Sequence, residues 1–197
     1  MKRIEKILAF DCETTGLSYG VNPSLNHSMV SVGLIVANAK FEPIESLYVE
    51  IQWDGKSKWE PEAEKIHGLS REYLAQNALT HADAAEKIGG LLFEHFGMYQ
   101  PIMLLGTNVM SFDIFFLDNF LQSMEIPFRF SHRGLDTFSL AMGTVRAETS
   151  NELFDLLGFE KRGKHNALDD ASMSLAAFRQ IYTQWNEMEE VCQQVLS

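Results

Sequence analysis

The sequence predicts an α/β fold in which helices cover one mixed β-sheet. Three observations support this class. Apolar, β-branched stretches fill the front third of the chain, helical patterns alternate with further apolar runs after residue 80, and no repeat or linker interrupts the 197 residues. The antiparallel arrangement expected of the front strands disfavours a purely parallel sheet. A chain of this length that is 46% hydrophobic suits a single domain over residues 1–197.

The front strands are expected at 7–10, 29–39 and 46–53, where short apolar runs are bounded by turn-forming residues. Two later strands are expected at 101–105 and at 128–134, the second of them at an edge of the sheet. Because the strands come first and helices alternate with them later, the sheet should be mixed rather than purely parallel.

Helices are expected where a Ser or Thr N-cap precedes apolar residues at three- and four-residue spacing. Ser70, Thr80 and Ser111 are such caps. Further helices are expected to begin near 135–137 and to span 151–157. The last helix is expected over 167–195, with Asn166 as its cap and an apolar seam along one face.

The charge balance limits the kinds of partner. A net charge of −11 disfavours a long, nonspecific grip on nucleic acid, because that grip depends on many Lys and Arg contacts to phosphates. It does not exclude a phosphate substrate, since bound metal can supply positive charge locally. The two cysteines, Cys12 and Cys192, lie far apart, and no apolar run is long enough to span a bilayer. We therefore expect a reducing, cytoplasmic setting, no signal peptide and no membrane association.

Two carboxylates follow the first apolar run. Alternation along a strand places Asp11 and Glu13 on one face, roughly 6 to 7 Å apart from about 3.3 Å of rise per residue, with Phe10 and Cys12 on the other. Such acids repel each other, and a divalent cation with oxygen ligands would offset that cost. The alternative on this stretch alone is an edge strand with two solvated acids.

Further acids and one histidine share this kind of setting. Asp113 follows the strand expected at 101–105, while Asp169 and Asp170 begin the last helix directly after His165. Each acid alone is explained by the helix dipole, which favours negative charge in a first turn. Together, several carboxylates and a histidine at the ends of core elements favour a two-cation site for phosphoryl chemistry. Nucleotide-binding glycine loops are absent from the sequence.

The order and spacing of five stretches resemble the DEDDh group of 3′-to-5′ exonucleases, the DnaQ-like family. The sequence DCETTGL at 11–17 is similar to its first motif, GTNVMSFD at 106–113 to its second, and HNALDD at 165–170 to its third. The stretches IHGLS at 66–70 and LDT at 135–137 resemble two lesser signatures of the family. The resemblance covers nearly the whole chain.

The resemblance implies an RNase H-like fold, with a five-stranded mixed sheet and helices on both faces. It also implies that two Mg²⁺ or Mn²⁺ ions are bound by four carboxylates, Asp11, Glu13, Asp113 and Asp170, and that His165 is the general base. Asp169 is expected to be only a helix-start acid. The 3′-terminal nucleotide would be bound by motif residues, namely Thr14, Thr15, Gly16, Leu17, His67, Asn108 and Phe112. Phe112 and Tyr19 are candidates for stacking on a base.

The activity implied is release of nucleoside 5′-monophosphates from single-stranded 3′ ends of RNA or DNA, or from short oligonucleotides. Signatures of RNase T, oligoribonuclease and exonuclease I are mixed, so the subfamily and the choice between RNA and DNA stay open. Two other functions also stay open: a binding module of the same fold that has lost its chemistry, and a phosphatase of small phosphate esters. The sequence leaves a homodimer open as well.

Overall fold

A computed structural model describes residues 5–17, 22–159 and 163–196. Five strands form one sheet in the order β3-β2-β1-β4-β5. They are β1 (Lys6–Thr14), β2 (Met29–Asn38), β3 (Pro43–Glu50), β4 (Ile102–Gly106) and β5 (Phe130–Asp136). β2 runs antiparallel to both β1 and β3, whereas β4 runs parallel to both β1 and β5. The predicted mixed sheet is confirmed, and β1 lies at its centre.

The central strand β1 continues past the apolar run at 7–10 and includes the first two acids. Its ladder with β2 continues through Asp11 opposite Gly33 and Glu13 opposite Ser31, and its register shifts only between Glu13 and Thr14. Strand pairing therefore fixes the backbone at both carboxylates. They sit on a rigid element rather than on a loop.

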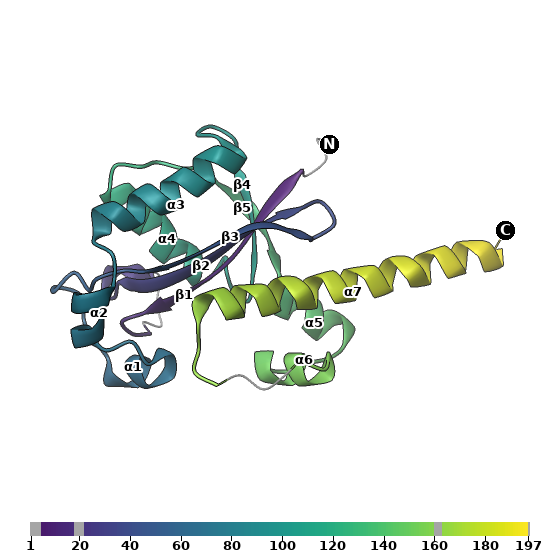
Figure 1. Cartoon of the computed structure of the whole chain (residues 1–197). Helices are drawn as coiled ribbons and strands as arrows, with labels where there is room; N and C mark the ends of the chain where they lie inside the picture. Colours follow the sequence, from purple (N-terminus) through teal and green to yellow (C-terminus); the bar gives the residue numbers. More distant parts are fainter. Residues whose placement is uncertain (1–4, 18–21, 160–162, 197) are drawn as a thin grey trace.

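Helices cover both faces of the sheet, as expected (Figure 1). On one face α3 (His81–Phe96) and α4 (Asp113–Ser123) pack with Leu8 and Phe10 of β1 in the larger apolar core. On the other face α7 (Ala167–Leu196) packs with Ile7 and Ala9. Because side chains alternate along β1, Asp11 and Glu13 belong to the face covered by α7.

The remaining helices are short. Ser70 caps α2 (Arg71–Asn77), and the Thr80 hydroxyl accepts the Asp83 N–H at 3.2 Å to cap α3, which confirms both predicted caps. The sequence did not predict α1 (Pro61–His67), which ends at Gly68 with a φ of 76°. The other two are α5 (Thr137–Thr144) and α6 (Ser150–Leu156).

The cap predicted at Ser111 is wrong. The helix α4 begins two residues later, with Phe112 at its N-cap and no side-chain cap. The Ser111 hydroxyl instead donates to the Asn108 carbonyl at 3.0 Å, and the same carbonyl accepts the N–H groups of Ser111 and Phe112. A tight turn at Asn108, whose φ is 57°, therefore uses the hydroxyl that could have capped the helix.

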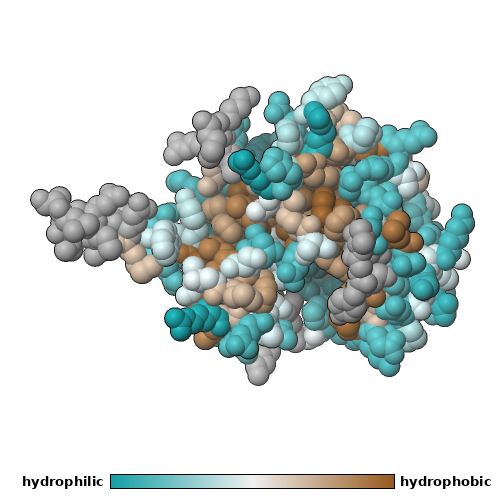
Figure 2. All heavy atoms as spheres, turned by 180° about the vertical axis from the view of Figure 1, so that it is seen from behind, coloured by the Kyte–Doolittle hydropathy of each residue, from teal (hydrophilic) through white to brown (hydrophobic). Residues whose placement is uncertain are grey.

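Helix α7 continues well beyond the sheet that its first half covers (Figure 1). In the second half of this helix Tyr182, Trp185 and Met188 are exposed, and the Tyr182 ring still packs against Phe41 with centroids 5.0 Å apart. The face of the molecule seen from behind has apolar residues gathered near its middle, with hydrophilic residues around them (Figure 2). Within the described residues, no helix combines the length and apolarity needed to cross a membrane.

Candidate active site

Gly33 lets the last helix approach the acids of β1. A Cβ at Gly33 would lie 2.3 Å from the backbone nitrogen of Leu168, in the first turn of α7. Only glycine permits that approach, and Gly33 pairs with Asp11 across the sheet. Sequence reasoning missed this role, although an isolated glycine inside an apolar strand is a known sign of close backbone approach.

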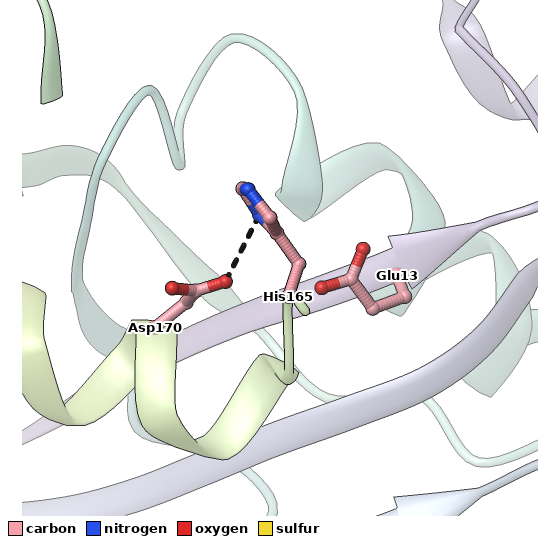
Figure 3. A group of neighbouring side chains, drawn as sticks. All are labelled: Glu13, His165 and Asp170. Carbon is pink, nitrogen blue, oxygen red and sulfur yellow. Dashed lines mark ion pairs between the residues drawn. The ribbon is translucent and has the colours of Figure 1, made fainter. Parts of the chain in front are cut away.

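The close packing of α7 brings three predicted site residues together (Figure 3). One ligand atom from each of Glu13, His165 and Asp170 lies within 4.8 Å of the others. His165 Nδ1 lies 3.3 Å from Asp170 Oδ2. The predicted cap is confirmed, because Asn166 Oδ1 accepts the N–H groups of Leu168 and Asp169.

Asp113 reaches the same region from the start of α4, on the opposite side of the sheet from α7. Its Oδ1 accepts the backbone N–H of Cys12 at 3.1 Å and the Cys12 thiol at 3.2 Å. Burial raises the pKa of Asp113 to about 7, although the Cys12 hydrogen bonds oppose the shift. Burial, together with the Asp113 charge, raises the pKa of the Cys12 thiol well above its ordinary value. A nearby cation would favour the ionised form of Asp113.

A cavity of about 570 Å³ collects nearly all the predicted site residues. All five residues predicted to be catalytic line it, namely Asp11, Glu13, Asp113, His165 and Asp170. The expected nucleotide contacts that line it are Thr14, Leu17, His67, Asn108 and Phe112. Thr15 and Gly16 do not line it, and Tyr19 lies outside the described residues. Asp11 and Asp113 share the cavity without belonging to the tight group of Glu13, His165 and Asp170.

His67 brings a buried ring to the wall of this cavity from the end of α1. Its Nδ1 accepts the Leu69 N–H at 3.0 Å, so in the neutral ring the proton is on Nε2. Among the described residues, Nε2 makes no hydrogen bond of good geometry, although the Thr14 backbone is close enough to influence the pKa of the ring. Burial lowers the pKa of His67, which favours the neutral form. The cavity wall therefore contains a buried imidazole N–H donor.

The lining is acidic. Among the described residues it contains no Lys or Arg, and it includes two acids that sequence reasoning missed, Glu60 and Glu62. No motif surrounds these two acids, so only the folded chain identifies them. Carboxylate oxygens with one imidazole nitrogen suit Mg²⁺ or Mn²⁺. Burial makes the ionised form of Asp113 unfavourable, and a bound cation would offset that cost. The residues present therefore fit divalent cations.

Comparison with a family model gives one match that covers most of the chain. The model described as RNase T exonuclease matches residues 8–178. A probable oligoribonuclease of Schizosaccharomyces pombe is 24% identical over 187 residues, which are 92% of this chain and 69% of that protein.

Solved structures resemble the chain in fold. The zinc-bound complex of Escherichia coli exonuclease I with single-stranded DNA superposes with a TM-score of 0.70 at 18% identity, over 95% of this chain and 42% of that one. A 3′-exonuclease described for 3′-end recognition of a histone mRNA stem-loop gives 0.64 at 14% identity, over 93% of this chain and 84% of that one. These likenesses confirm the RNase H-like fold. The chain spans less than half of the exonuclease I chain.

Proposed function

Because this chain belongs to the RNase T family of exonucleases, we propose that it releases nucleoside 5′-monophosphates one at a time from single-stranded 3′ ends of RNA or DNA. One observation supports this most strongly: Glu13, His165 and Asp170, from opposite ends of the sequence, present ligand atoms within 4.8 Å of one another. Asp11 and Asp113 line the same cavity. A histidine among carboxylates suits metal-assisted hydrolysis of a phosphodiester, because the carboxylates can hold the metal and the imidazole can accept a proton.

Four carboxylates, Asp11, Glu13, Asp113 and Asp170, would hold two divalent cations, Mg²⁺ or Mn²⁺. When bound, the cations supply Lewis-acid stabilisation of the phosphate and of the leaving 3′ oxygen, and they make a water more acidic. No Lys or Arg of the described residues lines the cavity, so we expect these acids to attract the phosphate through the cations they hold.

His165 would act as the general base. If its Nδ1–H donates to Asp170 Oδ2, 3.3 Å away, the Nε2 lone pair takes the proton from the attacking water. Asp170 then orients the ring as well as contributing negative charge. The imidazole can do this near neutral pH, where histidine changes its protonation state.

The terminal nucleotide would lie against Leu17 and Phe112, with polar contacts from Thr14, Asn108 and His67. Leu17 is 48% exposed, and its side chain can pack against a base. Phe112 is half-buried, and its ring centroid lies 5.0 Å from that of Phe116, which would support it under a stacked base.

The test is a panel of 5′-labelled RNA and DNA oligonucleotides of graded length, incubated with Mg²⁺ or with a chelator. We expect a ladder shortening from the 3′ end, release of mononucleotides, and no reaction with chelator. Binding without cleavage would favour a non-catalytic module instead. Hydrolysis of a chromogenic phosphate ester but not of oligonucleotides would favour a phosphatase.

Three points remain predictions: a single exonuclease domain over residues 1–197, a cytoplasmic location and a homodimer. Size-exclusion chromatography with light scattering tests the oligomeric state. The oligonucleotide panel decides between RNA and DNA, a choice that depends on contacts to the 2′-hydroxyl.

A further inference from the structure

The backbone that follows β1 is held from two sides by Glu60. The Leu17 N–H donates to Glu60 Oε2 at 3.1 Å, and the Glu60 N–H donates to the Thr15 carbonyl at 2.7 Å. These two bonds lie on either side of Gly16. They fix the turn from which Leu17 enters the cavity wall.

His27 supports the other oxygen of the same carboxylate. Its ring is buried, with Nε2 at 3.4 Å from Glu60 Oε1 and Nδ1 at 3.2 Å from the Lys58 carbonyl. Nδ1 also lies 3.4 Å from the Thr15 hydroxyl. The single N–H of the neutral ring donates either from Nδ1 to the Lys58 carbonyl or, with Nδ1 accepting from Thr15, from Nε2 to Glu60. We call the pair Glu60 and His27 the clamp.

Gly16 makes room for the clamp. A Cβ at this position would lie 2.5 Å from His27 Cε1 and 2.6 Å from Glu60 Oε2. Any side chain larger than hydrogen would force the carboxylate and the imidazole away from the backbone. Gly16 of the first motif is therefore required by the positions of Glu60 and His27, which belong to no motif.

From this geometry we propose that Glu60 and His27 are positioning residues, which hold Leu17 where it packs against the terminal base of the substrate. The inference rests on the proposed exonuclease function. Glu60 adds a negative charge to a cavity that must accept a polyanion, which weakens substrate attraction. Its bond to the Leu17 N–H offsets that disadvantage by ordering the base-binding wall before the substrate arrives.

The test separates KM from kcat on a short 5′-labelled oligonucleotide with Mg²⁺. Glu60→Ala should raise KM about tenfold, the loss expected for a hydrogen bond to a charged group, with kcat changed by about twofold or less. Glu60→Gln keeps a carbonyl acceptor for the Leu17 N–H and should stay near the wild-type KM. Glu62→Ala is the matched control, since Glu62 lines the same cavity and carries the same charge. It should not raise KM.

A double-mutant cycle keeps the inference testable if Glu60→Ala also weakens the fold. Leu17 is exposed, so Leu17→Ala should fold normally and raise KM. If Glu60 acts through Leu17, adding Glu60→Ala to Leu17→Ala should raise KM far less than it does in the wild type.

Three results would overturn the clamp: an unchanged KM in Glu60→Ala, a Glu60→Gln variant as impaired as Glu60→Ala, or full additivity with Leu17→Ala. A wild-type protein that releases no mononucleotides would instead refute the proposed function. The two failures are therefore distinguishable.

Discussion

Removing the charge of Asp113 should stabilise the metal-free protein, in a way that depends on pH. The pKa of Asp113 rises from its ordinary value of 3.8 to about 7, chiefly because the carboxyl is buried. The folded state therefore binds more protons than the unfolded state between about pH 4 and pH 7, and stability falls as pH rises through that window. At 1.36 kcal/mol per pKa unit, the full cost above pH 7 is about 4 kcal/mol.

The change Asp113→Asn removes that cost and keeps an oxygen that can accept the Cys12 N–H, which bonds Asp113 at 3.1 Å. For a protein of this size, about 4 kcal/mol corresponds to about 8 to 16 °C in melting temperature. The assay is thermal unfolding followed by circular dichroism in chelator, from pH 4 to pH 8. The gap between variant and wild type should open with rising pH and be complete above pH 7.

Two comparisons make this test specific. Asp169→Asn removes an exposed acid from the start of α7 and should show no gap that grows with pH. Adding Mg²⁺ should stabilise the wild type more than Asp113→Asn and narrow the gap, because a bound cation favours the ionised carboxylate. A gap that is constant across the pH range, or a variant less stable than wild type at pH 8, would refute the reasoning.

Three other predictions concern catalysis. Asp11→Asn, Glu13→Gln and Asp170→Asn should each nearly abolish turnover with the fold retained, while Asp169→Asn stays near wild type; an active Asp170→Asn beside an inactive Asp169→Asn would show that the last ligand is misassigned. His165→Ala should lower kcat by roughly 10²- to 10⁴-fold, and the wild-type rate should rise with pH as the imidazole loses its proton. A His165→Ala variant with a near-normal rate at neutral pH would exclude His165 as the base. In a substrate-length series, kcat/KM should level off after a handful of nucleotides. Its decrease between two salt concentrations should correspond to about two to four phosphate contacts. Activity that keeps rising with substrate length would indicate an extended basic groove.

Local patterns predicted most of the scaffold because local forces set it. Alternation on β1 placed Phe10 and Asp11 on opposite faces, and the structure confirms that arrangement. The side chains of Thr80 and Asn166 cap helices by accepting backbone N–H groups only two or three residues further along the chain. The sequence alone could therefore identify both caps. Ser111 failed as a cap because the turn at Asn108 competes for the same hydroxyl.

By itself the sequence determined the acids, the histidine and their order along the chain, since motif spacing encodes which core element each one follows. Only the tertiary structure decided how near they come. Gly33 admits α7 to the sheet, which sets the distance between Asp170 and β1. The burial that raises the pKa of Asp113 depends on packing between segments far apart in the chain. The contact of Glu60 with Leu17 also joins distant segments. No local pattern specifies such contacts, because they depend on how separate elements pack against one another.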